Sequence, residues 1–464
     1  MPPARRARLS SPPNSSVAAA DPSSRGARRE PSKRPRRADS SSHGGAEDGT
    51  PLTDEILVGI FAGLPEIADL VRCAATCSRW CRLVSSEAAF ICRTTPRPWP
   101  GRFVRRLALG FFHQDAAELR FAPTASAARL VGLLRTPSLK ALVEQPENGL
   151  FHSPRLVASR NGLIVADLRR GRRERAIKLC VCNPMTGEVN ILPPLSGEDG
   201  IGRYACTVLT ADDHDQTSES DPPPPASYRV ILFYNTCRSN TAFRSYSSED
   251  GVWSPEAIRS ERLGKKQMGM GVTRTAVVVE GGKVACWFAK NAVLALSLDT
   301  LHAQVLSRAF VDGNTILGVS PEWKLCTIQM IFREAMADWQ RYVALRVSKL
   351  NRSIYQRQEE DEVELIQVEQ HLPADVTKVK LRWFCEKSGV VLFTAGYRDG
   401  RSEVYALSLD KQEVQKVASH GAGGGGGDPW ENLHGYEMDR AAYLATLGVG
   451  YRMVREDSLD YEYA

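Results

Sequence analysis

The clearest hydrophobic pattern in the chain lies between Leu52 and Cys92. In its first part, apolar side chains recur at intervals of three and four residues, which places them on one face of a helix: Ile56, Leu57, Ile60, Phe61 and Leu64. Thr53 precedes this run at the N-cap position, where a hydroxyl can accept a backbone N–H, and Pro65 ends it. The pattern therefore predicts a short amphipathic helix between Thr53 and Pro65.

A second apolar stripe follows with almost no loop, and we expect it to form one helix, with a third helix starting before Cys92. Its apolar positions at helical spacing are Ile67, Leu70, Cys73, Ala74, Cys77, Trp80, Cys81 and Val84. A module of about 40 residues cannot bury this much apolar surface by itself. It is either a docking surface for helices of another protein, which we favour, or a helical hairpin of a larger core.

After residue 150 the pattern changes to short apolar runs. These runs are separated by Gly, Asn, Asp and Pro, which is typical of strands joined by turns. About 300 residues of such strands exceed one ordinary sandwich, whereas a β-propeller of roughly six four-stranded blades accommodates them.

The chain is thus predicted to be an α+β multidomain protein, in which a small three-helix module precedes a large all-β domain. The expected divisions are residues 1–50, a disordered basic tail; 51–95, the helical module; 96–150, a connecting segment of mixed character; 151–450, the propeller-like domain; and 451–464, a C-terminal tail.

The helical module resembles the F-box. Family members combine a Leu-Pro-x-Glu start, an Ile-Phe-x-x-Leu-Pro centre, a Cys, and an Arg-Trp pair followed by Leu. Thr53 stands where the family usually has Pro. The matching positions here are Leu52 to Glu55, Ile60-Phe61, Leu64-Pro65, Cys77, Arg79-Trp80 and Leu83.

The resemblance implies that the module binds a Skp-type adaptor and, through it, the cullin of a ubiquitin ligase. On this basis we expect ten residues at the adaptor-binding surface: Leu52, Leu57, Ile60, Phe61, Leu64, Pro65, Leu70, Cys77, Trp80 and Leu83.

Several phrases of the second half are similar to the F-box-associated β domain of plant proteins, a family generally regarded as kelch-like propellers. They include Val157 to Ile164, Cys182 to Gly187 with Leu192-Pro193-Pro194, and Tyr246 to Gly251 followed by Trp253. Kelch and WD repeat signatures are not convincingly present. The resemblance implies that this domain holds a protein target, whose identity the sequence does not give.

The N-terminal tail carries most of the net charge. Residues 1–50 hold ten Lys and Arg against five Asp and Glu, which accounts for +5 of the formal +6. Few apolar residues are present there, so disorder is expected. Basic clusters of this kind are read by nuclear import receptors or remain solvated without a receptor; the import candidates are Lys33, Arg34, Arg36 and Arg37.

Composition bears on three further questions: membrane association, cellular compartment and nucleic-acid binding. No run of 18 apolar residues and no signal-peptide core are present, so no membrane span is expected. Eleven cysteines in apolar surroundings favour reduced thiols in an intracellular protein, in the nucleus or the cytoplasm or both. Because residues 51–464 are nearly neutral, we regard nucleic-acid binding by the folded part as unlikely.

Motifs for catalysis and metal binding are missing from the sequence. It has no phosphate loop, no His-Glu-x-x-His and no Gly-x-Ser-x-Gly. We expect Cys73, Cys77 and Cys81 on one helical face, and Cys180 and Cys182 on one strand face, to act as packing residues, because buried cysteines behave as small hydrophobes. No catalytic residue, cofactor or metal is therefore predicted.

The sequence thus favours a non-catalytic substrate-recognition subunit of a Skp–cullin–F-box ubiquitin ligase. Two other classes remain open. One is a nuclear interaction protein that acts outside a ligase, with a tail that contacts nucleic acid. The other is a propeller enzyme or sugar binder with the helical module as an appendage, which a buried cluster of carboxylates, His or a metal at the central channel would favour.

Overall fold

The computed structural model describes most of the helical module and of the β domain. The described residues are 52–64, 67–94, 103–104, 107–115, 118–125, 127, 154–169, 176–195, 204–210, 213, 227–235, 241–259, 276–279, 283–289, 292–300, 302–307, 314–334, 341–350, 363–421 and 428–448. The predicted tails at 1–50 and 451–464, with the import candidates, lie outside them.

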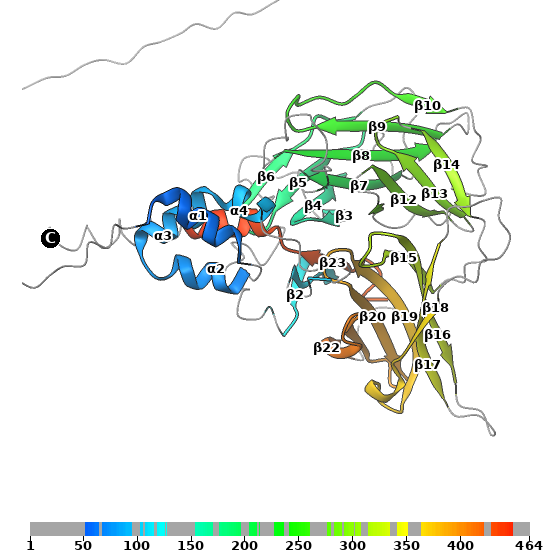
Figure 1. Cartoon of the computed structure of the whole chain (residues 1–464). Coiled ribbons are helices and arrows are strands. Elements are labelled where there is room, and N and C mark those ends of the chain that lie inside the picture. The colour runs from blue at the N-terminus through cyan, green and yellow to red at the C-terminus, as the bar shows by residue number, and fades with distance from the viewer. Residues whose placement is uncertain are drawn as a thin grey trace, which may run out of the picture. The chain divides into compact units, whose positions relative to one another are not determined.

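The N-terminal module contains four helices, which Figure 1 shows grouped together. They are α1 (Asp54–Ala62), α2 (Ile67–Ala74), α3 (Ser78–Ser86) and α4 (Ala88–Thr94). The predicted second helix is therefore wrong in its extent, since the chain divides it into α2 and α3. The Thr76 N–H bonds to the Cys73 carbonyl at 3.0 Å and tightens the last turn of α2. Cys77 then adopts an extended conformation as the N-cap residue of α3.

Thr53 occupies the N-cap position of α1, as the sequence predicts, but its side chain makes no capping hydrogen bond. The acidic residues Asp54 and Glu55 lie in the first turn, where they suit the helix dipole. The start of α1 therefore depends on these charges and on tertiary contacts, and not on the expected Thr53 hydroxyl.

The described strands of the β domain form six separate antiparallel sheets. Five contain four consecutive strands each. Their bounds are β3 (Arg155–Arg160), β4 (Leu163–Asp167), β5 (Leu179–Asn183) and β6 (Glu188–Ile191); β7 (Tyr204–Thr210), β8 (Tyr228–Asn235), β9 (Thr241–Ser247) and β10 (Ala257–Arg259); β11 (Val277–Val279), β12 (Val284–Ala289), β13 (Ala292–Ser297) and β14 (Ala303–Ser307); β15 (Thr315–Val319), β16 (Leu325–Arg333), β17 (Tyr342–Lys349) and β18 (Val363–Gln367); and β19 (Val376–Cys385), β20 (Val390–Tyr397), β21 (Ser402–Ser408) and β22 (Glu413–His420).

The sixth sheet joins the two ends of the β domain. Its order is β2-β1-β23, so that β1 (Ala108–Asp115) pairs with β2 (Glu118–Pro123) on one side and with β23 (His434–Glu437) on the other. In each of the five four-stranded sheets, the first strand is the inner strand of the blade. In the sixth sheet, the inner strand is β23. The structure is thus a six-blade β-propeller, and the predicted fold class is confirmed.

Closure of the propeller by β1 and β23 also places the start of the β domain earlier than predicted. The sequence assigned residues 96–150 to a connecting segment, yet β1 and β2 lie within it and belong to a blade. The pairing of β1 with β23 spans more than 300 residues of sequence, and a non-local pairing of this kind leaves no local pattern.

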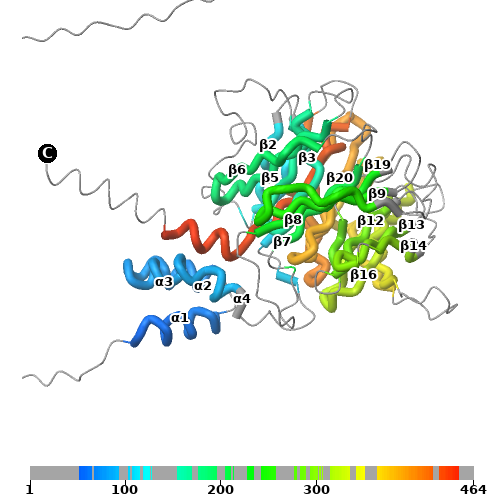
Figure 2. Tube along the Cα trace, turned by 90° about the horizontal axis from the view of Figure 1, so that it is seen from above, coloured from blue at the N-terminus to red at the C-terminus, as the bar shows by residue number. Residues whose placement is uncertain are grey.

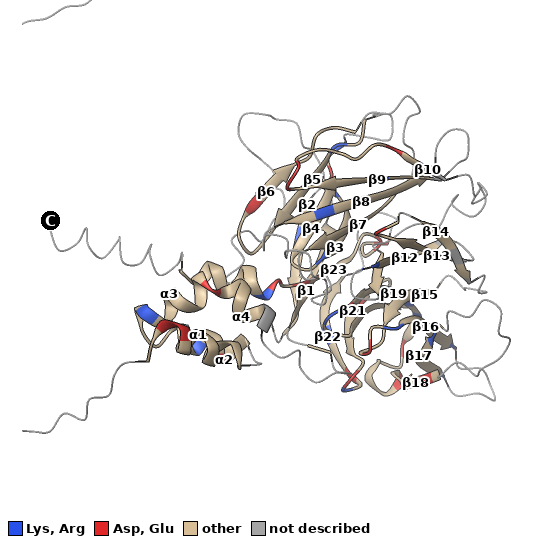
Figure 3. Cartoon of the chain, turned by 45° about the horizontal axis from the view of Figure 1, so that its top comes forward, with Lys and Arg blue, Asp and Glu red and all other residues tan. Residues whose placement is uncertain are grey.

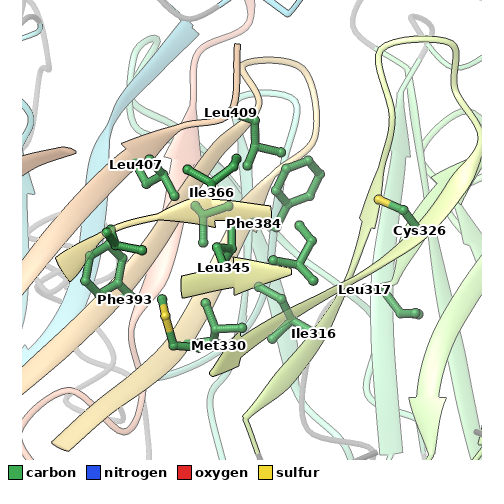
Figure 4. Close-up of a cluster of buried hydrophobic side chains, with 14 of the residues drawn as sticks. Ile316, Leu317, Cys326, Met330, Leu345, Ile366, Phe384, Phe393, Leu407 and Leu409 are labelled. Atoms are coloured by element: carbon green, nitrogen blue, oxygen red, sulfur yellow. The ribbon is translucent and has the colours of Figure 1, made fainter. Parts of the chain in front are cut away.

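Apolar side chains fill the spaces between neighbouring blades. Figure 4 shows side chains of the sheets β15–β18 and β19–β22 that belong to one buried cluster, which also includes residues of β11–β13. Alternate strand residues face the neighbouring sheet, as the two-residue side-chain period requires. The labelled side chains are Ile316, Leu317, Cys326, Met330, Leu345, Ile366, Phe384, Phe393, Leu407 and Leu409.

A final helix, residues 440–448, follows β23 and packs beside the N-terminal helices, as the red segment of Figure 2 shows. Tyr443 and Leu444 of this helix are buried. They belong to one hydrophobic cluster with residues of α1–α4, of β1 and of the blade β3–β6. The helical module and two blades therefore share a continuous core.

Candidate functional site

Helix α1 has two apolar faces, of which only one is covered by the chain. Leu57 and Phe61 point into the core and are buried. Leu52, which directly precedes the N-cap, and Ile56 and Ile60 of α1 are 48%, 50% and 49% exposed. Ile56 and Ile60 share one face of α1, because they are four residues apart in the helix, and Leu52 lies just before the helix start. We call Leu52, Ile56 and Ile60 the exposed stripe.

Contacts from α3 fix the position of α1. The Arg79 guanidinium donates to Asp54 Oδ1 through Nε at 2.8 Å and to the Leu52 carbonyl at 2.5 Å. The Trp80 ring packs edge-on against Phe61, with 5.4 Å between ring centroids. The Arg-Trp pair of the sequence motif therefore holds the helix that carries the exposed stripe.

The ten residues predicted to bind an adaptor fall into two groups. Leu57, Phe61, Leu70 and Leu83 are buried within the chain, so the expectation that they present surface is corrected: they hold the helices together. Leu52, Ile60 and Cys77 are exposed, and Leu64 and Trp80 are partly buried. Pro65 lies outside the described residues.

Two surface residues were missed by the prediction. Ile56 belongs to the exposed stripe, and Phe90 of α4 is 44% exposed. The spacing of Ile56 from Leu52 and Ile60 could have identified it. For Phe90 no comparable pattern exists, because its exposure depends on how α4 packs.

Gly59 lies between the exposed Ile56 and Ile60 and is itself exposed. A Cβ atom added there would meet nothing within 4 Å, so the fold of this chain does not require a glycine. Glycine inside a helix costs about 1 kcal/mol relative to alanine. At Gly59 the helix backbone is bare, which lets another backbone approach the stripe closely.

The inner strands of the propeller meet in a buried ionic network. Arg160, at the end of β3, binds both carboxylate oxygens of Asp213 at 2.5 and 2.7 Å and both oxygens of Glu386 at 3.2 Å. The Val278 N–H of β11 also donates to Glu386, and the Lys387 and Ser388 N–H groups donate to Glu437 of β23. The network thus joins the inner strands of five blades.

Each carboxylate of this network is engaged by the chain. Burial by itself raises the pKa of Asp213, but the charge of Arg160 and its hydrogen bonds outweigh this and hold the pKa below its usual range. Burial raises the pKa of Glu386, and Arg160 offsets only part of that effect. In the described part of the chain, no group of three or more His, Cys, Asp or Glu residues could hold a metal ion. The network therefore has the character of a cross-link between blades.

Three cysteines of the helical module are not arranged as predicted. Cys73 lies in α2, Cys77 at the N-cap of α3 and Cys81 within α3, so they do not share one helical face, and Cys77 is exposed. Cys180 and Cys182 are buried on β5 and both belong to the same core as the helical module, as expected of packing residues on one strand face. Cysteines in the described residues carry free thiols.

Charged residues are interspersed over the described elements. Figure 3 shows acidic and basic positions scattered over the helices and blades, without one extended basic region among the residues drawn in colour. None of the described helices is both long and apolar enough to cross a membrane.

Comparison with known families identifies the helical module. The family model described as F-box-like matches residues 54–92. These residues form an F-box-like domain. The match starts at the first residue of α1, extends into α4 and includes Ile56 and Ile60 of the exposed stripe.

Two solved structures show distant similarity to the chain. A chain of a nidogen/laminin complex is 10% identical, covering 67% of this chain and 92% of that one, with a TM-score of 0.34. An α-L-arabinofuranosidase of Fusarium graminearum, solved with arabinobiose, is 10% identical over 57% of this chain and 79% of its own, with a TM-score of 0.33. No curated protein matches the chain. The evidence for the propeller is therefore the strand topology itself.

Proposed function

We propose that this protein is a substrate-recognition subunit of a Skp–cullin–F-box ubiquitin ligase and has no catalytic activity of its own. The observation that carries the proposal is the exposed stripe on α1 of an F-box-like domain. F-box domains generally bind Skp-type adaptors, and a propeller offers loops at two faces for a protein target.

The stripe offers part of the apolar contact that docking of a partner needs. Fully burying a large aliphatic side chain contributes about 1.5–3 kcal/mol, before the cost of association is subtracted. Leu52, Ile56 and Ile60 are each about half exposed, so each has roughly half of this gain still available. Gly59 lets the adaptor backbone come close, and Phe90 adds a second apolar contact on α4.

In such a complex the ligase would act by proximity. The propeller would hold a target near the ubiquitin-loaded enzyme that the cullin recruits. A target lysine would then meet the thioester at high effective concentration, which requires no acid, base or metal from this chain. The phrases that resemble the plant F-box-associated domain support the same arrangement.

Co-purification with a Skp-type adaptor tests the proposal. Ile56→Asp and Ile60→Asp place a charge on the exposed stripe, and we expect either to abolish co-purification. Leu365→Asp is the matched control, because Leu365 on β18 is 54% exposed and lies on a different element. Trp80→Ala is a poor test, since loss of its contact with Phe61 would disturb the helices themselves. If wild type fails to bind, or if all variants bind equally, the proposal is wrong.

The basic cluster Lys33, Arg34, Arg36 and Arg37 leads us to propose that the protein enters the nucleus. The position of a fluorescent fusion, compared with a variant carrying Ala at these four residues, tests this. Equal distribution of the two forms would contradict an import role.

A further inference from the structure

We infer that the C-terminal helix, residues 440–448, couples closure of the propeller to the integrity of the F-box-like domain. The two parts then open and close together, and the F-box-like domain is not an independently stable module of this chain. The inference concerns folding, so it holds whether or not the proposed ligase function does.

The C-terminal helix takes part in the core of the F-box-like domain. Tyr443 and Leu444 are buried in the cluster that contains Leu70, Val84 and Ile91. A second set of contacts joins the helix to α3. The Cys81 thiol donates to the Leu447 carbonyl at 3.8 Å, and a Cβ added at Gly448 would lie 2.4 Å from Ser85 Oγ.

A very short connection joins the C-terminal helix to β23, the strand that closes the propeller by pairing with β1. Only Met438 and Asp439 separate β23 from the helix. The Met438 N–H donates to the Leu107 carbonyl at 2.9 Å, and its side chain is buried in the shared core. Asp439 Oδ1 accepts the Ala442 N–H at 3.1 Å and so caps the helix start.

Strand β23 is in turn fixed to two neighbouring blades. The Gly162 N–H donates to the Glu437 carbonyl at 2.8 Å, and the Tyr436 hydroxyl donates to the Gly162 carbonyl at 3.2 Å. On the other side, the Glu437 carboxylate accepts the Ser388 N–H at 2.7 Å. A Cβ at Gly162 would lie 2.6 Å from Asp439 Cβ, so the first blade also touches the connection to the helix.

The consequence is a mechanical link between the two ends of the chain. If β23 leaves its sheet, the two-residue connection withdraws Tyr443 and Leu444 from the F-box-like core. Conversely, loss of the helix exposes the core face of α3 and frees the end of β23. An open propeller would therefore also lose the folded helices that carry the exposed stripe.

Hydrogen exchange on the full-length chain, read by mass spectrometry, tests the link. The double variant Tyr443→Ala with Leu444→Ala removes the buried contacts of the helix. We expect exchange to become at least about tenfold faster in both α1–α4 and β23, since core truncations of this size lower local stability strongly. Ala445→Ser is the control on the same helix, because Ala445 is exposed, and it should change neither region.

A second pair of variants, placed in strands of the propeller, tests whether disturbing β23 affects the helices α1–α4. Gly435→Val on β23 meets Trp383 Cδ1, which lies 2.4 Å from the position of the added Cβ, and Gly318→Val on β15 meets Ile328 Cδ1 at 2.6 Å. We expect faster exchange in α1–α4 for Gly435→Val alone, because β15 has no such connection to the helix. Unchanged exchange in α1–α4, despite faster exchange in residues 434–448, would overturn the inference. No adaptor is needed, so this outcome is distinct from a failure of the proposed function.

Discussion

At the scale of single residues, several buried charges in the described blades have partners of opposite sign. Arg160 forms ion pairs with both Asp213 and Glu386. Asp167 accepts hydrogen bonds from Arg169 and from the Tyr204 hydroxyl, each at 2.7 Å. A buried pair of this kind contributes little net stability when intact, but removal of one partner leaves the other charge uncompensated. Substitutions at these positions are therefore expected to be costly.

Asp167 allows a prediction of pH dependence. Burial by itself raises its pKa, but the hydrogen bonds and charge of Arg169 and the Tyr204 hydroxyl outweigh this and lower the pKa below its usual range. A carboxyl whose pKa is lowered in the folded state stabilises the fold above its unfolded pKa of about 3.9, and this contribution is lost as the pH falls through the folded value.

Chemical denaturation at several pH values measures this contribution. We expect Asp167→Asn to lower the free energy of unfolding by about 1–3 kcal/mol at pH 7, and by less near pH 3. A constant difference between wild type and variant over this range would show that the Asp167 charge plays no part.

At the scale of elements, the blades are held together by alternate strand residues that face the neighbouring sheet. Leu345 on β17 is fully buried between two blades, whereas Leu365 on the outer strand β18 is largely exposed. The two leucines lie on adjacent strands of one sheet, so they differ in burial and not in residue type or sheet.

Substitution of these two leucines separates packing from surface effects. We expect Leu345→Ala to lower the free energy of unfolding by roughly 2–5 kcal/mol, because it leaves a cavity in the core. Leu365→Ala should change it by less than about 0.5 kcal/mol. Denaturant midpoints, compared at equal m-values, give the change in the free energy of unfolding for each variant. Equal effects of the two substitutions would contradict the assignment of Leu345 to the inter-blade core.

At the scale of the whole molecule, the charge distribution distinguishes two classes of partner. Residues 1–50 carry +5 of the net +6, so residues 51–464 carry only +1. The described blades and helices mix both signs (Figure 3). A low net charge gives little general electrostatic attraction to nucleic acid.

Binding to DNA or RNA, measured by fluorescence anisotropy at increasing salt, tests the nuclear interaction alternative. We expect the full chain to bind weakly and removal of residues 1–50 to make little difference. Tight binding that falls steeply with salt and is lost on this deletion would favour the alternative, in which the tail contacts nucleic acid, over a ligase subunit.

The sequence by itself determined the local features of this protein. The period of 3.6 residues located α1, the short apolar runs between turn residues indicated a large strand-rich domain after residue 150, and the combination from Leu52 to Leu83 identified the F-box-like domain. Each of these signals depends on neighbours within about ten residues, so it is present in the sequence before the chain folds.

Only the tertiary structure decided which surfaces stay free. Leu57 and Ile60 look alike in the sequence, yet the first is buried and the second is exposed, because α3, α4 and the shared core cover one side of α1. The pairing of β1 with β23, the meeting of Arg160 with Asp213 and Glu386, and the packing of residues 440–448 against α3 join distant segments. Such contacts depend on closure of the propeller and on side-chain packing, which no local pattern encodes.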